Sequence, residues 1–523
     1  MATFGELLNE ARRLLGAGRL EQAEPIYRQL LEAVPEAAEA WHELGILHVQ
    51  ADRPEAAAEC LQKAVALAPD SAAYHSNLGA VHRQLKRTVA ALACFQRAVQ
   101  LSSPSPQLFN NLGLALKDAG NEDEALAAYD DALKVRDDYA NGHFNRANLL
   151  LTIGRVDEAI AAYRRAIELV PNDAEAHYRL GIAHYDEPQL DAALACWDRA
   201  LALRPHYPEA RRNRALVWLR REDYARGWAE WESRLECEGF VTRDCPQPRW
   251  DGAPVPGRTL LLHAEQGLGD TLHFIRYVEL ARPLAGALKV EVQAPLIPLL
   301  ANSGYGRWLV RQGDPVQCDV HCPLLSVPFT LAERGGAPYW NGPYLVPDPQ
   351  RVAAWERRLG AIGGFKVGIV WAGNPDHPND RFRSVRLAEF ARLATVPGVR
   401  LVSLQKGAGR SRLAEMPGDV QVIDFGDELD ESSGAFMDTA AVIRHLDLVV
   451  TVDTAMAHLA GGMGAPVWLL LQRSPDWRWM LDGQETPWYP SMRLFRQRKL
   501  HEWDAVFADL AEQLRQLVAR STA

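Results

Sequence analysis

The chain has 523 residues, which is enough for about three domains with large buried cores. Its formal net charge of −10 and isoelectric point near 5.9 argue against a nucleic-acid-binding protein. We expect a cytoplasmic protein without a membrane span, because the first residues lead into an amphipathic helix and no apolar stretch is long and unbroken. The seven cysteines are scattered, as is typical of small reduced core residues.

The first half of the chain repeats one pattern of small and large apolar residues every 34 residues. The pattern begins with Gly45, Ala57 and Leu61, and its small positions allow two antiparallel helices to cross closely. We expect the large residue to fill the gap between neighbouring hairpins. The pattern resembles the tetratricopeptide repeat over roughly residues 4 to 237, which predicts an α-solenoid. The shifted copies are Gly79, Ala91 and Phe95; Gly113, Ala125 and Tyr129; Ala147, Ala159 and Tyr163; and Gly181, Ala193 and Trp197.

One position of the repeat carries asparagine four times, always two residues before the small residue of the first helix. These residues are Asn77, Asn111, Asn145 and Asn213. We expect them on the concave face, where amides both donate and accept and so bind the backbone of an extended acceptor peptide. The ladder resembles that of O-linked N-acetylglucosamine transferases. The alternative is that asparagine is an ordinary helix-surface residue here, since Glu43 and Arg179 interrupt the register.

The segment Cys245–Gly257 is rich in proline and glycine, and we interpret it as a linker. Strands and helices alternate after it, which predicts two Rossmann-like halves with parallel sheets. The predicted domains are 1–240 for the repeats, 241–350 for the linker and first half, and 351–523 for the second half. Strands are expected at 259–262, 288–292, 366–371, 400–404, 420–424, 448–452 and 466–471.

A polar pair follows the strand at 448–452. Asp453 and Thr454 open a helix that we expect to run from Ala455 to Ala460, where two glycines break it. A hydroxyl and free amides at a helix N-terminus bind phosphate, and His458 lies one turn further on the same face. The alternative is a plain N-cap followed by a core histidine.

Two motifs of this α/β half resemble signatures of the ADP-heptose glycosyltransferases of lipopolysaccharide synthesis. They are Gly269-Asp270-Thr-Leu-His273, and Val452-Asp-Thr-Ala-Met-Ala-His-Leu-Ala460 with Gly464-x-Pro466. The resemblance covers roughly residues 257 to 520 and implies the GT-B fold, which has two Rossmann-like domains. It implies that Asp270 is the base for the acceptor hydroxyl.

The same resemblance assigns the donor site. Asp453, Thr454 and His458 correspond to the motif that holds the phosphates and ribose of the nucleotide-sugar. A cation of the second half balances the diphosphate charge in that family, and Arg381, Arg383 and Lys406 are the candidates here. Donor binding is assigned as well to Gly267, Gly269 and Asn374, which follow the first strand of each half.

The chain also departs from that family, which has no repeat domain and a longer first half. Its end instead resembles bacterial proteins in which repeats are fused to a compact GT-B module, some of them associated with flagellin glycosylation. Two interpretations are open for the aromatic cluster Trp477, Trp479, Trp488 and Tyr489. Its rings could stack on a ligand, but we favour packing around the last strand and a return helix at 503–517.

Neither a metal nor a cofactor is predicted. No Asp-x-Asp motif follows a strand, and the Cys318-x3-Cys322 pair has no second ligand pair as a structural zinc site requires. The sequence therefore predicts a metal-independent, inverting glycosyltransferase that uses a nucleotide-sugar and modifies a protein held by the repeats. Two alternatives stay open: a nucleotide-binding adaptor without turnover, and an enzyme acting on glycan or lipid whose repeats form a homo-oligomer.

Overall fold

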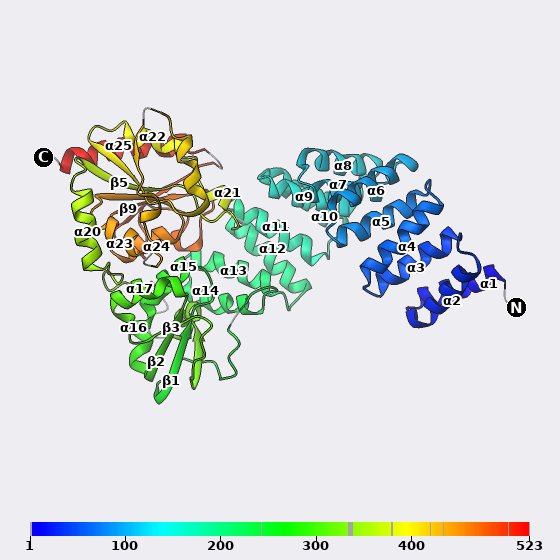
Figure 1. Ribbon diagram of the computed structural model, residues 1–523, viewed down its shortest axis with the longest axis horizontal. Helices are drawn as coiled ribbons and strands as arrows, with labels where there is room; N and C mark the ends of the chain where they lie inside the picture. The colour runs from blue at the N-terminus through cyan, green and yellow to red at the C-terminus, as the bar shows by residue number, and fades with distance from the viewer. Residues whose placement is uncertain are drawn as a thin grey trace. The chain divides into compact units, whose positions relative to one another are not determined.

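The computed structural model describes residues 3–241, 243–332, 338–377, 380–418, 420–431, 434–499 and 502–521. A helical repeat solenoid over residues 4–236 precedes an α/β region with two parallel sheets, so the expected fold class is confirmed (Figure 1). The chain divides into two compact units, Met1–His184 with Asp198–Arg204, and Tyr185–Trp197 with Pro205–Ala523. The second unit therefore contains the last helical hairpin as well as both sheets.

The solenoid consists of helical hairpins that follow the predicted period. Their helices are α1 (Phe4–Gly16), α2 (Leu20–Ala33), α3 (Ala38–Gln50), α4 (Pro54–Leu67), α5 (Ala72–Gln84), α6 (Thr88–Leu101), α7 (Pro106–Asp118), α8 (Glu122–Val135), α9 (Ala140–Thr152), α10 (Val156–Leu169), α11 (Ala174–Asp186), α12 (Leu190–Leu203), α13 (Pro208–Arg220) and α14 (Tyr224–Trp231). A short 3-10 helix, η1 (Glu232–Glu236), follows α14.

The repeated glycines allow the two helices of a hairpin to approach closely. A Cβ added to Gly45 would lie 2.7 Å from Leu61 Cγ, and one added to Gly113 would lie 2.6 Å from Tyr129 Cε1. The large residue therefore packs on the glycine of its own hairpin, which the sequence analysis did not anticipate. It also reaches the next hairpin as expected, since Leu61 shares an apolar cluster with Leu78.

The first sheet is parallel, with strand order β3-β2-β1-β4. Its strands are β1 (Val255–His263), β2 (Ala285–Val292), β3 (Leu309–Arg311) and β4 (Val320–Pro323). The helices α15 (Leu268–Phe274), α16 (Val278–Ala281), α17 (Ile297–Leu300) and α18 (Val327–Thr330) belong to the same half. Periodicity missed β3 and β4, because they are short and β4 contains His321.

The second sheet is also parallel, with the order β10-β9-β8-β5-β6-β7. Its strands are β5 (Phe365–Val370), β6 (Val399–Ser403), β7 (Val422–Ile423), β8 (Leu448–Val452), β9 (Val467–Leu471) and β10 (Met492–Arg496). Further helices are α20 (Pro349–Leu359), α21 (Asp380–Arg383), α22 (Ala391–Ala394), α23 (Met437–Ile443), α24 (Ala455–Gly462), η10 (Trp477–Trp479) and α25 (Asp504–Ser521). The direction of winding reverses between β5 and β8, where doubly wound sheets bind ligands.

Gly461 and Gly462 do not break the helix after β8, contrary to expectation, because α24 continues through both. Each glycine instead admits a close neighbour. A Cβ on Gly461 would lie 2.7 Å from the Tyr489 ring, and one on Gly462 would lie 2.7 Å from Leu345 Cδ1. Packing therefore outweighs the low helix propensity of glycine at this place.

The aromatic residues near the C-terminus are packing residues, because Trp477, Trp479, Trp488 and Tyr489 are all at most 1% exposed. As expected, they share an apolar cluster with Leu469 and Leu471 of β9. The same cluster contains Trp228 of α14, on which Trp477 packs edge to face, whereas the return helix belongs to another cluster. The helix α25 packs on the second sheet through Phe507, Leu510 and Leu514. No helix in the described ranges is long and apolar enough to cross a membrane.

Candidate functional site

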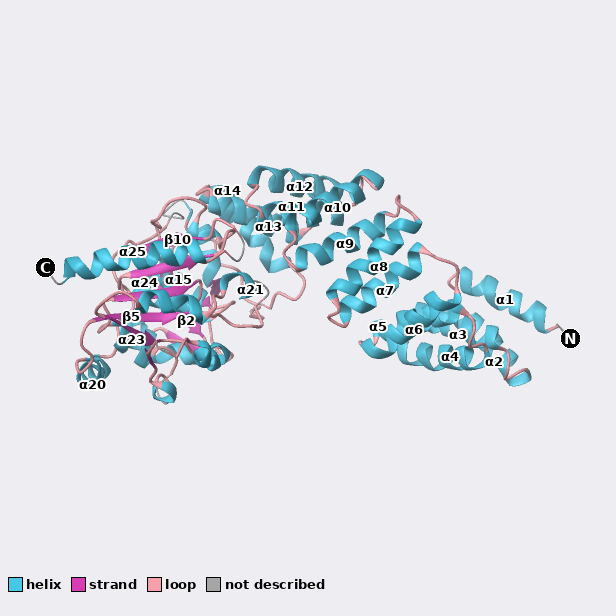
Figure 2. Ribbon diagram, turned by 90° about the horizontal axis from the view of Figure 1, so that it is seen from above, coloured by secondary structure: helices cyan, strands magenta, loops and turns pink. Residues whose placement is uncertain are grey.

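The helices that follow β1 and β8 meet at their N-termini. Gly269 of α15 faces α24, and a Cβ added to it would lie 3.1 Å from His458 Cδ2 and 3.2 Å from Ala455 Cα. Figure 2 also shows α15 and α24 side by side. A side chain at position 269 would therefore push the two helices apart, which gives the glycine a structural reason. The approach brings Gly269, the residue before Asp270, against Ala455 and His458 of the second half.

Asp270 is held by an ion pair that the sequence analysis missed. Arg478 Nη2 lies 2.7 Å from Asp270 Oδ1, and Arg478 Nη1 lies 2.9 Å from Asp476 Oδ1. The Arg478 side chain is buried, whereas 23% of the Asp270 side chain is exposed. Asp270 is thus oriented by one cation and still reaches solvent, where an acceptor hydroxyl would have to approach.

Two carboxyl groups of this site have raised pKa values. Burial raises the pKa of Asp270, and nearby Asp476 adds to this, while Arg478 acts in the opposite direction. Burial and Asp476 raise the pKa of Asp453 to about 7, against the influence of Arg383. Asp453 therefore holds its proton to a much higher pH than an ordinary aspartate does. Perturbed carboxylates that meet at one place are typical of functional sites.

Thr454 and His458 occupy the first turns of α24. Thr454 is the N-cap and accepts a hydrogen bond from Met456 N at 3.4 Å, so the capping interpretation holds for this residue. His458 stacks on Trp479, with ring centroids 5.5 Å apart. Its Nδ1 lies 2.8 Å from the Tyr489 hydroxyl, which also lies 2.9 Å from His273 Nδ1. Burial holds the pKa of His458 well below its usual range, so this imidazole is neutral.

The candidate cations differ in their surroundings. Arg383 lies at the reversal point of the second sheet: its Nη1 donates to Asp453 O at 3.1 Å, and its Nε donates to Asp380 Oδ1 at 3.1 Å. Arg381 is exposed and lies over the Phe382 ring at 4.4 Å. Lys406 donates to Leu429 O at 2.5 Å. Arg383 is thus the candidate with a direct contact to the predicted phosphate motif.

The remaining donor candidates, Gly267 and Asn374, lie in the loops that follow β1 and β5. Gly267 is the N-cap of α15 in extended conformation, and its backbone lowers the pKa of Asp270. Asn374 is exposed after β5, where its Oδ1 accepts from Asp376 N at 3.1 Å. Its side chain therefore supports a turn.

The repeat asparagines are half-buried and partly engaged. Asn77 Nδ2 lies 2.7 Å from His42 Nε2, and Asn145 Nδ2 donates to the buried Asn110 Oδ1 at 2.8 Å. Both bonds link a first helix to the first helix of the preceding hairpin, rather than leaving the amide free in solvent as expected. The Asn111 side chain has no partner among the described residues, and Asn213 lies on α13.

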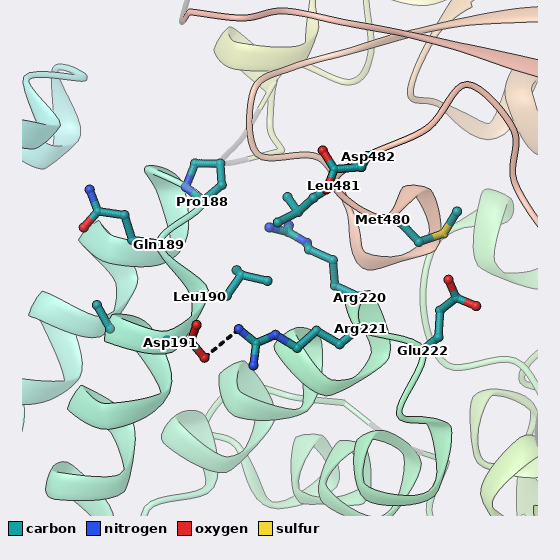
Figure 3. A pocket seen from close by; sticks show the side chains of 11 residues that line it. Pro188, Gln189, Leu190, Asp191, Arg220, Arg221, Glu222, Met480, Leu481 and Asp482 are labelled. Carbon is teal, nitrogen blue, oxygen red and sulfur yellow. Dashed lines mark hydrogen bonds and ion pairs between the residues drawn. The ribbon is translucent and has the colours of Figure 1, made fainter.

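A pocket of about 670 Å³ lies beside the segment that contains Arg478 (Figure 3). It is lined by the start of α12, the end of α13 and residues 480–482, and Arg221 pairs with Asp191 in it at 2.7 Å. None of the site residues predicted from sequence lines this pocket.

The cysteines of the candidate metal motif are separated by the fold. Cys322 is buried in β4, whereas Cys318 Sγ lies 3.9 Å from Cys245 Sγ of the linker. No cluster of three or more His, Cys, Asp and Glu side chains suited to a metal occurs in the part of the chain that the structure describes.

Sequence reasoning missed Arg478 and Asp476 as residues of this candidate site. Their signal was present in the Asp476-Trp-Arg-Trp479 run, where charges interrupt an aromatic segment, but nothing in the sequence says which distant carboxylate the arginine meets. Only the contact between α15 and the segment after β9 reveals the partner.

Family models described as tetratricopeptide repeat match residues 8–72, 42–106, 107–136 and 178–236, and one described as TPR repeat matches 149–187. The solenoid thus consists of tetratricopeptide repeats. Protein FlbA of Caulobacter vibrioides is 27% identical to this chain over 332 residues. The match includes 58% of the chain, and the chain spans about half (55%) of the length of that curated relative.

Solved structures resemble the repeats. The pilF protein of Pseudomonas aeruginosa is 21% identical, with a TM-score of 0.36, and the match covers 40% of this chain and 96% of that one. A tetratricopeptide repeat protein from Parabacteroides merdae is 16% identical, with a TM-score of 0.40, covering 46% of this chain and 94% of that one.

Proposed function

We propose that this chain is a glycosyltransferase that moves a sugar from a nucleotide-sugar to a protein acceptor recruited by its repeats. The observation that carries the proposal is the meeting of α15 and α24, in which Gly269, next to Asp270 in the chain, packs against the first turns of α24. A carboxylate suits deprotonation of an acceptor hydroxyl, and a helix N-terminus suits the departing diphosphate.

In this mechanism Asp270 takes the proton from the acceptor hydroxyl while the oxygen attacks the sugar carbon that bears the diphosphate. Direct displacement from the opposite face inverts the configuration at that carbon. The amides at the start of α24 and the Arg383 guanidinium stabilise the charge that develops on the leaving diphosphate. Arg478 orients the Asp270 carboxylate through the bond of 2.7 Å.

The repeats would supply the acceptor protein. Asn111 supports this role, because its amide is uncommitted among the described residues while the neighbouring Asn77 and Asn145 are tied to other side chains. Amides with free donors and acceptors bind extended backbone with little demand on side chains. Bacterial flagellin is the acceptor that the likeness to repeat-fused GT-B proteins suggests.

One observation favours the alternative of an adaptor without turnover. The Arg478 ion pair occupies an oxygen of the proposed base, and a carboxylate in a tight ion pair is a weak base. In that case the chain binds a nucleotide and a protein but transfers no sugar.

A panel of nucleotide-sugars separates these functions. The proposal predicts that at least one nucleotide-sugar raises the unfolding temperature of the full chain and is consumed slowly by it, whereas Asp270→Asn retains the thermal shift and loses the consumption. Binding without consumption by the unmodified chain, with and without acceptor protein, would establish the adaptor. No binding by any member of the panel would reject both.

A further inference from the structure

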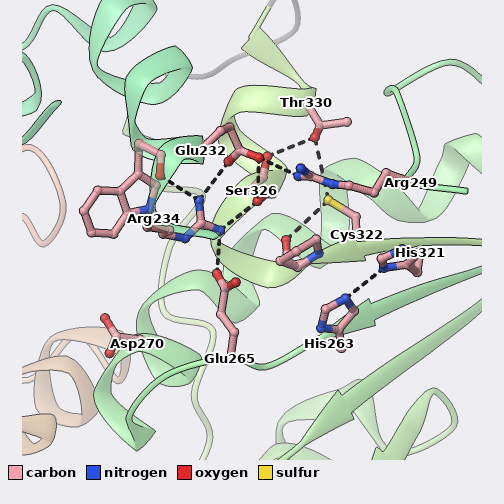
Figure 4. A network of polar contacts seen from close by, with 12 residues as sticks. Glu232, Arg234, Arg249, His263, Glu265, Asp270, His321, Cys322, Ser326 and Thr330 are labelled. Atoms are coloured by element: carbon pink, nitrogen blue, oxygen red, sulfur yellow. Dashed lines mark hydrogen bonds and ion pairs between the residues drawn. The ribbon is translucent and has the colours of Figure 1, made fainter. Parts of the chain in front are cut away.

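The ligand crevice of the first sheet contains a side chain from the end of the repeats. Winding reverses between β1 and β4, and in parallel sheets the loops at such a point enclose a ligand. Here Arg234 of η1 fills that place (Figure 4), and its side chain and that of Glu265 are both 0% exposed. The first half thus binds part of its own chain where a doubly wound sheet ordinarily binds a ligand.

Arg234 connects the loops that leave the two central strands. Its Nη2 donates to Glu265 Oε1 at 2.6 Å, two residues after β1, and to Ser326 Oγ at 2.7 Å, three residues after β4. Its Nη1 donates to Glu232 Oε1 at 2.8 Å and to Trp231 O at 3.1 Å. The guanidinium fork thereby fixes both loops against η1 in one arrangement.

The hairpin before Arg234 packs into the same core. Trp228 of α14 is fully buried, and its ring lies edge to face with Phe274 of α15 at 6.1 Å between centroids. The end of α13 contacts the second half, because buried Arg220 donates to Ser474 Oγ at 3.1 Å. The last hairpin is therefore a structural part of the α/β region.

Glu265 stands five residues before Asp270, in the loop that contains Gly267. Since this loop leads directly into α15, its position sets where the Asp270 carboxylate lies. A carboxylate that acts as base must be held to within a fraction of an ångström of its productive place.

We propose that Arg234 is a positioning residue, which holds the loop 264–267 and through it Asp270. The inference rests on the proposed function as far as catalysis is concerned, while the placement of the loop stands independently of it. The repeat half thereby contributes to the site through its structure, beyond any role in recruiting an acceptor.

The test removes both buried charges together, because Arg234→Met alone would leave Glu265 buried without a partner. The full-length double variant Arg234→Met/Glu265→Gln is compared with Arg249→Met. Arg249 also pairs with Glu232 but is 45% exposed and has no bond to Glu265 in the structure. Arg234→Lys, which keeps the charge and loses the fork, is the second variant.

Amide hydrogen exchange is measured over residues 264–274, together with nucleotide affinity and turnover. We expect faster exchange in that segment for the double variant, a smaller increase for Arg234→Lys, and none for Arg249→Met. Nucleotide affinity should change much less than kcat, because most of the proposed donor residues belong to the second half, while kcat falls by at least about tenfold at little change in KM.

Unchanged exchange in the folded double variant would overturn the proposal, and so would an equal increase for Arg249→Met. If Arg234→Lys folds when the double variant does not, its exchange decides in the same way. If the unmodified chain shows no turnover, the proposed function fails, and the exchange data still decide whether Arg234 positions the loop.

Discussion

Arg478 Nη2 donates to Asp270 Oδ1 at 2.7 Å, although 208 residues separate the two in the chain. This bond joins the helix after the first strand of one sheet to the segment after β9 of the other. A residue of the second half therefore orients the carboxylate of the predicted base in the first half. Most of the chemistry that we expect of this protein depends on that relationship.

Replacing Arg478 should change the pH dependence of transfer. Arg478→Gln removes the cation that lowers the pKa of Asp270, so that pKa rises further and the base is protonated up to a higher pH. We expect the acidic limb of the pH–rate profile to move to higher pH, measured as kcat/KM across the range. Arg493→Gln is the control, because Arg493 is half-buried on β10 and its guanidinium bonds Gln484 rather than Asp270. If the acidic limb stays at the same pH in Arg478→Gln, Asp270 is not the base.

Removing the base itself should affect transfer and not binding. Asp270→Asn keeps the size of the side chain and should lower transfer by about a hundredfold or more, the usual effect of losing a general base. Nucleotide-sugar affinity measured by calorimetry should stay the same. Transfer at the normal rate in this variant would contradict the assignment.

Two neighbouring arginines allow a matched test of the diphosphate site. Arg383→Met should weaken nucleotide-sugar binding by about tenfold or more, because it removes a charged contact beside Asp453. Arg381→Met should have no effect, since Arg381 is exposed and lies over Phe382. Calorimetry measures both affinities. Equal affinities in the two variants would mean that the diphosphate binds elsewhere.

Asp453 should make both stability and binding depend on pH. Its pKa of about 7 in the folded chain exceeds the ordinary 3.8, so the folded state holds a proton that the unfolded state releases between these values. Stability therefore falls as the pH rises through this window. Asp453→Asn should therefore stabilise the chain more at pH 8 than at pH 5.

The same charge should repel the donor. Because the esterified phosphates of a nucleotide-sugar do not titrate near neutrality, its affinity should decrease as Asp453 ionises above pH 7. Asp453→Asn should remove this decrease. Thermal unfolding and calorimetry at several pH values measure the two effects, and identical pH profiles for the variant and the unmodified chain would refute them.

The repeat asparagines should separate into two kinds. Asn145→Ala leaves the buried Asn110 oxygen without its donor and should destabilise the chain by about 1 to 2 kcal/mol. Asn111→Ala should leave the unfolding temperature unchanged and weaken acceptor binding by about two- to tenfold. Pull-down of the acceptor and thermal unfolding distinguish them. If Asn111→Ala modifies the acceptor normally, the result favours the alternative in which the repeats serve assembly and do not bind the acceptor.

The sequence by itself determined the repeat half and the positions of most strands along the chain. A period of 34 residues is a local signal, because each glycine meets a side chain 16 residues later in its own hairpin, as Gly45 meets Leu61. Strands such as β5 and β8 were equally predictable, since buried parallel strands are continuous apolar runs. The strands β3, β4 and β10 were not predicted, because each is short and none is a continuous apolar run.

The tertiary structure decided the partners of the site residues. The residues around Asp270 in the sequence do not predict its ion pair with Arg478. Those around Gly461 do not predict its contact with the Tyr489 ring. The burial of Arg234 could not be predicted either, because arginines in helical repeats are usually exposed. Only the folded structure shows that Arg234 donates to Glu265 and Ser326. Periodicity reports which face of an element is buried, whereas the choice of a distant polar partner depends on how whole sheets and helices pack, which no short segment encodes.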